Sequence, residues 1–188
     1  MSEGQKMLIA LGGNMPSDHG GPDQILHAAL QRLPQLGAQV VAVSRFYKTP
    51  CFPAGAGPDY VNAAAWLTCD ASPQDMLTKL HEVEMHFGRE RVRRWGQRTL
   101  DLDLIAIDDL VMPDVQTYRV WQKLPLDRQT QEAPDTLILP HPRMQDRAFV
   151  LVPLADVAPE WRHPVLGQTV CEMRDSLPPE ARAEVVPL

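Results

Sequence analysis

Cysteine is scarce in this chain of 188 residues, and its three copies follow no pattern typical of a metal site or a disulfide framework. The number of cysteines is odd, and they are widely spaced, at Cys51, Cys69 and Cys171. No two of them have the spacing of metal ligands. This usage argues against a disulfide-rich secreted domain and against a cysteine-based zinc site. We expect three unpaired thiols in a reducing compartment.

Long hydrophobic runs and net positive charge are also missing. No run reaches the roughly 18 apolar residues of a transmembrane helix, and the N-terminus lacks the apolar stretch of a secretory signal. The formal net charge of −6 argues against a nucleic-acid partner bound through overall charge. Hydrophobic residues still make up 44% of the chain, which is enough for a packed core. We therefore expect a cytoplasmic protein that binds neither membranes nor nucleic acid. We also expect a monomer.

The order of the periodic segments indicates an α+β fold. Strand and helix patterns recur in the order strand, helix, strand, strand, helix, strand, at residues 6–14, 22–37, 38–49, 60–69, 72–88 and 99–108. This βαββαβ order predicts a ferredoxin-like antiparallel sheet with helices on one face. Additional C-terminal elements, including one short helix near 168–176, are expected to follow.

No linker or internal repeat divides the chain, so a single domain over residues 1–188 is predicted. Residues 113–136 are polar, contain Pro113, Pro125 and Pro134, and show no convincing periodicity. They are predicted to form a long, mobile loop insertion. Regular structure is expected to resume at 138–159 with a short helical segment.

The second predicted helix carries an acidic residue on its apolar side. The helix is expected to begin at Ser72, whose hydroxyl suits the N-cap position, and to stop at Gly88. Glu84 falls within the apolar stripe, between Leu80 and Phe87. A carboxylate at such a position is costly unless it has a partner, so Glu84 is a candidate functional residue.

Two aspartates stand one residue apart in the last predicted strand, "TLDLDLIAID". Side chains alternate faces along a strand, so Asp101 and Asp103 point the same way while Leu102 points into the core. Carboxylates this close repel each other, and a bound cation removes the repulsion. Oxygen ligands of this kind suit Mg²⁺, and two such ions can clamp a phosphoryl group. The alternative is an edge strand with a solvated acidic face.

Five arginines precede the acidic pair: Arg89, Arg91, Arg93, Arg94 and Arg98. Such a cluster beside carboxylates is explained if a nucleoside triphosphate lies between them, held by metal ions and guanidinium groups. The alternative is a solvated surface run, and Trp95 within the run argues against it. His141 lies between two prolines in "LPHPRM" and can donate to a phosphate oxygen, although an exposed loop histidine is the alternative.

Several motifs together resemble the 6-hydroxymethyl-7,8-dihydropterin pyrophosphokinase family of folate biosynthesis. They are, in chain order, "ALGGN", "YKTP", "GPDYVNAA", "GRERVRRWGQRTLDLDL" and "LPHPRMQDRAFVLVPLADVAP". The "RWGQRTLDLDL" element is highly specific, whereas "ALGGN" alone is weak. The resemblance implies transfer of pyrophosphate from ATP to the hydroxymethyl group of the pterin, with release of AMP.

The resemblance also implies roles around the nucleotide. Asp101 and Asp103 would hold two Mg²⁺ ions that bridge the phosphates of ATP. Arg89 and Arg98 would stabilise the charge that develops during transfer. The residues that contact the nucleotide or close the site over it would be Glu84, Arg91, Trp95, Arg98, His141 and Arg147.

For the pterin, the resemblance implies that the rings of Tyr60 and Phe149 sandwich the flat heterocycle. Without the resemblance, both would be taken for ordinary core aromatics. The residues that read the hydrogen-bonding edge of the pterin would be Thr49, Asn62 and, through their backbone, Pro50 and Phe52.

Departures from the family pattern and two rival activities complete the interpretation. Gly13, His81 and Gln97 differ from residues common in the family, and the 113–136 insertion is longer than in compact members. A Mg²⁺-dependent nucleotide phosphohydrolase would use the acidic pair and the arginines without needing the pterin residues. A nucleotide sensor would bind ATP without turnover.

Overall fold

The computed structural model describes residues 4–51, 55, 57–88, 99–125, 128 and 131–188. Its elements are, in chain order, β1 (Gln5–Gly13), α1 (Pro22–Arg32), the 3₁₀ helix η1 (Leu33–Leu36), β2 (Gln39–Val43), β3 (Tyr47–Thr49), β4 (Tyr60–Cys69), α2 (Pro73–His86), β5 (Asp101–Ile107), α3 (Val115–Gln122), the 3₁₀ helix η2 (Met144–Asp146), α5 (Ala148–Val157), α6 (Val170–Asp175), α7 (Pro179–Ala183) and β6 (Val186–Pro187). Within these described ranges, no helix has the length and apolar character needed to span a bilayer.

The strands form one antiparallel sheet in the order β5-β1-β4-β3-β6, and β2 pairs with the other half of β4. The central strand β1 is buried on both faces. Its alternate residues Met7, Ile9 and Leu11 enter one core, and Leu8 and Ala10 enter the other. The prediction of an α+β fold with an antiparallel sheet is therefore confirmed.

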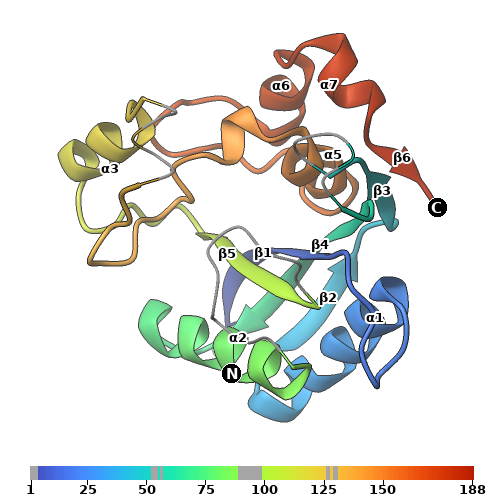
Figure 1. Cartoon of the computed structure of the whole chain (residues 1–188). Helices are drawn as coiled ribbons and strands as arrows, with labels where there is room; N and C mark the ends of the chain where they lie inside the picture. Colours follow the sequence, from blue (N-terminus) through green and yellow to red (C-terminus); the bar gives the residue numbers. More distant parts are fainter. Residues whose placement is uncertain (1–3, 52–54, 56, 89–98, 126–127, 129–130) are drawn as a thin grey trace.

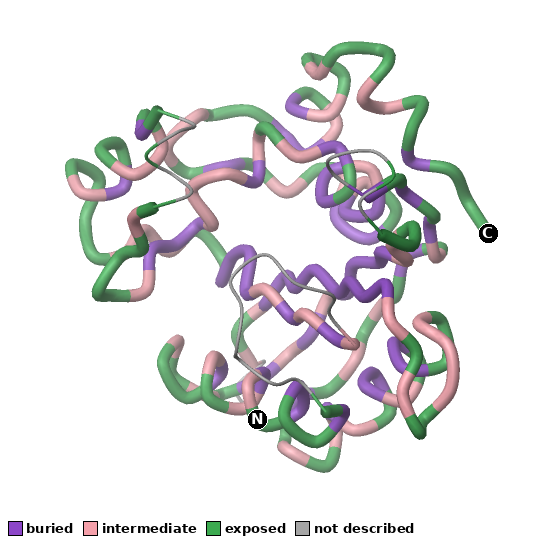
Figure 2. The backbone as a smooth tube through the Cα atoms, in the orientation of Figure 1, coloured by how far each residue is buried: buried purple, intermediate pink, exposed green. Residues whose placement is uncertain are grey.

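Helices cover both faces of this sheet (Figure 1). One core joins β1, β4 and β5 to α1 and α2, and a second core joins the opposite face to α5 and α6. Figure 2 shows the buried residues concentrated along the central strands and on the inner sides of the helices. The two helices of the βαββαβ order share one face, as predicted, and the C-terminal elements cover the other face.

Both ends of α2 follow the sequence signals. The Ser72 hydroxyl accepts a hydrogen bond from the backbone N–H of Asp75 (3.1 Å), which satisfies a donor of the first turn. Gly88 follows the last helical residues with φ of 82°, a left-handed conformation that favours glycine. The predicted start and stop of this helix are confirmed.

The segment predicted as one strand at 38–49 is two strands, because the chain leaves the regular ladder at residues 44–46. At this break, the backbone N–H of Ser44 donates to the Ala64 carbonyl, and the Ser44 hydroxyl accepts from the Ala64 N–H, both at 2.9 Å. Ser44 thereby replaces one ladder pair with a side-chain contact, and the strand direction changes before β3.

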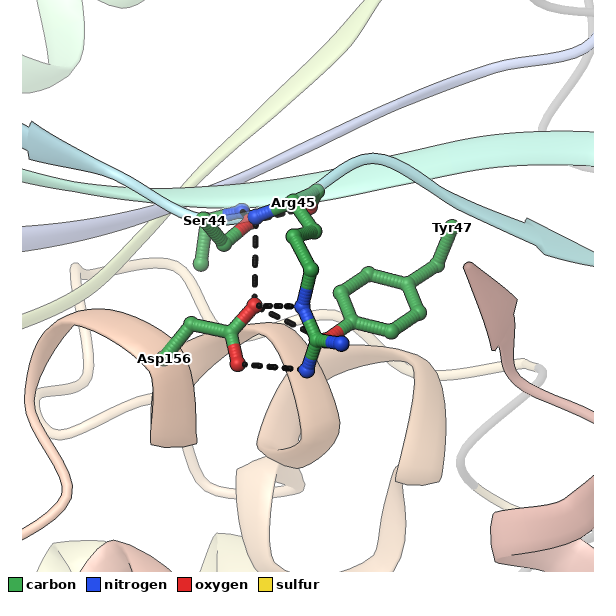
Figure 3. Close-up of polar contacts among 5 residues, drawn as sticks. Ser44, Arg45, Tyr47 and Asp156 are labelled. Atoms are coloured by element: carbon green, nitrogen blue, oxygen red, sulfur yellow. Dashed lines mark hydrogen bonds and ion pairs between the residues drawn. The ribbon is translucent and has the colours of Figure 1, made fainter. Parts of the chain in front are cut away.

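The Asp156 carboxylate of α5 holds the chain at the break between β2 and β3 (Figure 3). Asp156 accepts hydrogen bonds from the backbone N–H of Arg45 (3.1 Å), from its guanidinium (3.0 and 3.2 Å) and from the Tyr47 hydroxyl (2.8 Å). Burial alone would raise the pKa of Asp156, but the hydrogen bonds from Arg45 and Tyr47 lower it below its ordinary value. Burial, followed by the hydrogen bond to Asp156, raises the pKa of Tyr47 to about 12. We call this set of contacts the Asp156 clamp.

The insertion contains a helix, so the prediction of a loop throughout 113–136 is wrong for Val115–Gln122. Asp114 caps α3 by accepting from the Thr117 N–H (2.9 Å). Tyr118 is the one buried side chain of this helix, and its hydroxyl lies 2.8 Å from Nε2 of the buried His163. A single anchoring residue gives too weak a periodicity to be detected in the sequence.

Near the C-terminus, the helix expected around 168–176 is confirmed as α6. The short β6 was not predicted. It pairs with β3 through only two residue pairs, Tyr47 with Pro187 and Lys48 with Val186, so its sequence carries no strand-length alternation.

Candidate functional site

The two aspartates lie where β5 begins, beside the end of β1. Asp101 pairs with Gly12 and Asp103 pairs with Ala10. Leu102 between them is 2% exposed and enters the core beneath α1 and α2, whereas both aspartates are partly exposed. The predicted alternation is confirmed, and the carboxylates lie on the α5 side of the sheet. Among the residues that the structure describes, no group of three or more His, Cys, Asp and Glu side chains could hold a metal ion.

Glu84 supports the backbone between the two aspartates. Its side chain is 1% exposed, and its Oε1 accepts a hydrogen bond from the backbone N–H of Leu102 at 2.7 Å. Since β5 is at the edge of the sheet, its outward backbone groups need partners from outside the ladder. The sequence indicated that Glu84 needs a partner, and the structure identifies that partner as the strand that bears the acidic pair.

His141 is hydrogen-bonded to β5, the strand that bears the acidic pair. Its backbone N–H donates to the Ile105 carbonyl of β5 (2.7 Å), and its ring Nδ1 accepts from the backbone N–H of Arg143 (3.2 Å). Burial, then the charges of Arg147 and Arg143, lower the pKa of His141 to about 3, while the Asp101 carboxylate opposes them. The ring is therefore neutral at pH 7, and its single proton is on Nε2, where it can be donated.

Arg147 and Phe149 lie at the start of α5. Arg147 is the N-cap residue, and its carbonyl accepts from the N–H groups of Val150 and Leu151 (3.1 and 3.0 Å). The positive end of the helix dipole and the Arg147 charge therefore coincide. Phe149 is 41% exposed, and its ring centroid is 5.6 Å from the Arg147 guanidinium carbon. Its exposure excludes the interpretation of Phe149 as a core aromatic.

The residues predicted to read the pterin edge meet on β3 and β4. The Asn62 amide donates from Nδ2 to the Thr49 hydroxyl at 2.7 Å, and both residues are buried. Tyr60 is partly exposed and pairs with Thr49 across the two strands, and Pro50 is exposed directly after β3. The hydrogen-bonding side chains of Thr49 and Asn62 therefore lie on strands β3 and β4 beside the aromatic residue Tyr60. A site for a heterocycle needs both kinds of group.

Gly12 lies between the two predicted halves of the site, a position that the sequence did not reveal. It pairs with Asn62 on one side and with Asp101 on the other. A Cβ atom at Gly12 would lie 2.9 Å from Oδ1 of Asn62, closer than such atoms approach. The absent side chain therefore leaves the space that the Asn62 amide occupies. Detecting this needs the strand register, because Gly12 and Asn62 are far apart in the chain.

Two further contacts tie the segment after β3 to the end of β1. The Cys51 thiol donates to the Gly57 carbonyl (3.1 Å), and the Asn14 amide donates to the Pro58 carbonyl (3.2 Å). Both Cys51 and Asn14 are buried. The Cys51 thiol therefore forms a hydrogen bond within the segment predicted to bind the pterin. The number and spacing of the cysteines in the sequence could not reveal this contact.

The register brings the two halves of the predicted site together. Asp101, Gly12 and Asn62 form one row across β5, β1 and β4, which spans about 10 Å at the usual strand spacing. His141, Arg147 and Phe149 lie on segments that cover the same face. The remaining predicted site residues lie outside the described residues, namely Phe52, Arg89, Arg91, Trp95 and Arg98.

Comparison with known sequences identifies relatives over most of the chain. The sequence model of the 7,8-dihydro-6-hydroxymethylpterin-pyrophosphokinase (HPPK) family matches residues 8–159. The 2-amino-4-hydroxy-6-hydroxymethyldihydropteridine pyrophosphokinase of Pseudomonas aeruginosa is 39% identical over 164 residues, which cover 85% of each chain. The protein of the same name from Synechocystis is 36% identical over 168 residues, 88% of this chain and 73% of the relative.

Solved structures share the fold at low sequence identity. A Plasmodium falciparum HPPK-DHPS structure with pteroate has a TM-score of 0.66 and 14% identity, covering 92% of this chain. A second wild-type structure of the same protein has a TM-score of 0.63 and 15% identity. This chain spans 44% of the length of each of those two chains. The sequence matches show that the chain belongs to the 7,8-dihydro-6-hydroxymethylpterin-pyrophosphokinase family.

Proposed function

We propose that this protein transfers pyrophosphate from ATP to the hydroxymethyl group of 6-hydroxymethyl-7,8-dihydropterin, a step of folate biosynthesis. The proposal rests on one observation in a chain of this family: the row Asp101, Gly12, Asn62. It holds a carboxylate at one end and an ordered amide at the other, about 10 Å apart. That separation suits a phosphate-binding half and a heterocycle-binding half that meet at the reacting atoms.

Asp101 and Asp103 fit Mg²⁺ as ligands. They are two partly exposed carboxylates on one face of a strand whose backbone is held by Glu84. Mg²⁺ takes one or two carboxylates and completes its shell with water and phosphate oxygens, so a larger protein cage is not needed. Two bound ions would supply charge neutralisation for the triphosphate.

The side chains around the triphosphate bind and orient it. His141 donates its Nε2 proton to a phosphate oxygen, and Arg147 with the start of α5 offsets negative charge. The pterin hydroxyl oxygen bonds to the β-phosphorus of ATP while the bond from that phosphorus to the oxygen of the α-phosphate breaks. AMP leaves and the hydroxyl proton is released. No covalent intermediate on the protein is needed.

The pterin half depends on Asn62. Its bond to Thr49 fixes the amide, while Tyr60 and Phe149 offer aromatic faces to the ring. Cys51 and Asn14 hold the adjoining segment in place.

Replacing Gly12 with alanine is expected to raise the KM for the pterin about tenfold, because the new methyl group displaces the Asn62 amide from Thr49 and removes hydrogen bonds. The KM for ATP should change by less than about twofold. Steady-state kinetics with each substrate varied in turn measures both constants. Gly21→Ala, which adds the same methyl group at the start of α1, is the matched control. A pterin KM equal to that of the control would contradict the role of Gly12.

Product analysis tests the reaction itself. The protein is incubated with ATP, Mg²⁺ and the hydroxymethyldihydropterin, and the nucleotide and pterin products are identified by mass. We expect AMP and a pterin diphosphate in equal amounts. ADP or inorganic phosphate formed without pterin would favour a phosphohydrolase, and bound but unconverted ATP would favour a nucleotide sensor.

We further propose a ferredoxin-like classification for the βαββαβ part, supported by the order β5-β1-β4 with β2 on the far side of β4. A monomer acting in the cytoplasm is also proposed. The three cysteines are thiols outside any disulfide, which supports a reducing compartment.

A further inference from the structure

Tyr47 opens the motif "YKTP", but neither the family resemblance nor the proposed reaction gives it a role. It is the first residue of β3, and Thr49 is the last. Side chains two residues apart on a strand share a face, so Tyr47 and Thr49 point to the same side of the sheet. Across the ladder, Tyr47 pairs with Asn62 and Thr49 pairs with Tyr60. Tyr47 therefore lies directly opposite the amide on which the pterin half of the proposed site depends.

The Tyr47 side chain is held both at its ring and at its hydroxyl. Tyr47 is 2% exposed, and its ring belongs to a buried cluster with Ala148, from the first turn of α5, and Val185, just before β6. The hydroxyl donates to Asp156 near the other end of α5 at 2.8 Å (Figure 3). The Arg45 guanidinium, itself bonded to Asp156, has its carbon 5.3 Å from the Tyr47 ring centroid. The ring thus lies along α5 and is fixed by that helix.

The strand β3 is too short to be fixed by its ladder alone. Its three residues pair with β4, and two of them pair with β6, a strand of two exposed residues. Such short pairings are marginal without packing against a helix. The contacts of Tyr47 with α5 therefore contribute to the placement of the whole strand. At the other end of β3, the Thr49 hydroxyl accepts from the Asn62 amide at 2.7 Å.

The groups proposed to bind the triphosphate have separate anchors. The acidic pair lies on β5, whose backbone accepts support from Glu84. The start of α5, at Arg147, is fixed by the buried side chains of Met144 and Leu151. Asp156 lies about two and a half turns further along this helix. Loss of the Asp156 contacts should therefore move β3 and leave the phosphate-binding groups in place.

We infer that Tyr47, held by Asp156, is a positioning residue for the pterin. This inference rests on the proposed function for the identity of the ligand. The hydrogen bond between Tyr47 and Asp156 keeps β3 against α5, the helix that also carries Phe149. Thr49 is thereby held where it orients the Asn62 amide. Tyr47 and Asp156 act through these two residues and not on the reacting atoms.

Tyr47→Phe tests the inference, because it removes the hydroxyl and keeps the ring. The protein is first saturated with Mg²⁺ and the ATP analogue that carries a methylene bridge between the α- and β-phosphates. Calorimetric titration with 6-hydroxymethylpterin then gives the affinity for the pterin without turnover. We expect the dissociation constant for the pterin to rise about fivefold, the scale of one hydrogen bond. The dissociation constant for the nucleotide analogue should change by less than about twofold.

Tyr118→Phe is the matched control. Tyr118 is also a buried tyrosine, and its hydroxyl lies 2.8 Å from His163, but it belongs to α3. Both variants should lower the midpoint of thermal unfolding, whereas only Tyr47→Phe should weaken pterin binding. Equal pterin affinities in the two variants would overturn the inference, because any loss would then follow from stability alone.

Substitutions of Asp156 test the acceptor of the same hydrogen bond. Asp156→Ala removes the carboxylate and should raise the dissociation constant for the pterin about tenfold. Asp156→Asn keeps an oxygen that can accept from the Tyr47 hydroxyl, so it should recover part of the loss. The double variant with Tyr47→Phe should bind the pterin no more weakly than Asp156→Ala alone, because both changes break one bond. Additive losses would show that Tyr47 does not act through Asp156.

The same measurements separate this inference from the proposed reaction. If product analysis yields no AMP while pterin binding still depends on Tyr47, the reaction is wrong and the positioning role stands. If AMP is formed while Tyr47→Phe binds the pterin as tightly as Tyr118→Phe does, the reaction stands and the role of Tyr47 is wrong.

Discussion

Asp101→Asn and Asp103→Asn are each expected to lower turnover roughly a thousandfold, the scale on which enzymes lose rate when a charge-stabilising group is removed. The change keeps the size of each side chain and removes its charge, so metal binding is weakened without a cavity. Both residues are partly exposed, and the backbone between them is held by Glu84, so the fold should persist. Steady-state turnover at saturating Mg²⁺, with circular dichroism to check the fold, measures the effect.

Asp109→Asn is the matched control for these two variants. Asp109 is an exposed aspartate in the turn just after β5, away from the row that contains Gly12 and Asn62. It should keep full turnover. If Asp101→Asn or Asp103→Asn also kept near-normal turnover, the assignment of the acidic pair to metal binding would be wrong.

Acid is expected to destabilise the protein through His163, which anchors α3. The Val165 and Leu166 N–H groups donate to its Nδ1 (3.1 and 3.3 Å), so the ring proton is on Nε2 and is donated to the Tyr118 hydroxyl (2.8 Å). Burial lowers the pKa of His163 from 6.5 to about 4. Protonation would place a hydrogen on Nδ1, facing two N–H donors.

The sign of this effect follows from the lowered pKa. The unfolded chain binds the proton below about pH 6.5, whereas the folded chain resists it until about pH 4. The stabilisation is therefore complete above pH 6.5 and is lost as the pH falls toward 4. The free energy of unfolding should decrease by about 2 kcal/mol between pH 7.5 and pH 5 from this group alone.

Urea unfolding of the protein and of His163→Gln at pH 7.5, 6.5, 5.5 and 5 measures the contribution of His163 to the free energy of unfolding. The glutamine does not titrate, so its unfolding free energy should change with pH by about 2 kcal/mol less than that of the unchanged protein. His27→Gln, at an exposed position of α1, should keep the original pH dependence. Equal pH slopes for the unchanged protein and His163→Gln would show that His163 is not the group responsible.

Features with a local cause could be predicted from the sequence. Tyr60–Cys69 is a strand with the predicted bounds, and α2 is capped by Ser72 as expected, because alternation and capping involve neighbouring residues. The common face of Asp101 and Asp103 follows from the same alternation. The break in 38–49 was not detectable, because Asp156, which fixes it, is more than a hundred residues further along the chain.

The missed parts of the site share this physical reason. Gly12 matters because strand pairing places it beside Asn62, and the neutrality of His141 depends on burial and on Arg147 and Arg143 together. The helix α3 is anchored by its one buried side chain, Tyr118, whose hydroxyl contacts the distant His163. Each of these features is a property of packing between distant segments, and no window of sequence contains it.

The Asp156 clamp has a consequence for how the two substrates communicate. The Asp156 carboxylate lies near the end of α5, the helix that Arg147 caps. It accepts hydrogen bonds from residues at and just before the start of β3, the strand that ends at Thr49. The segments proposed to receive the two substrates are thus joined through one set of contacts. We expect the arrival of one substrate to leave the docking geometry for the other already in place, so that any ordered sequence of arrival would originate outside this set of contacts.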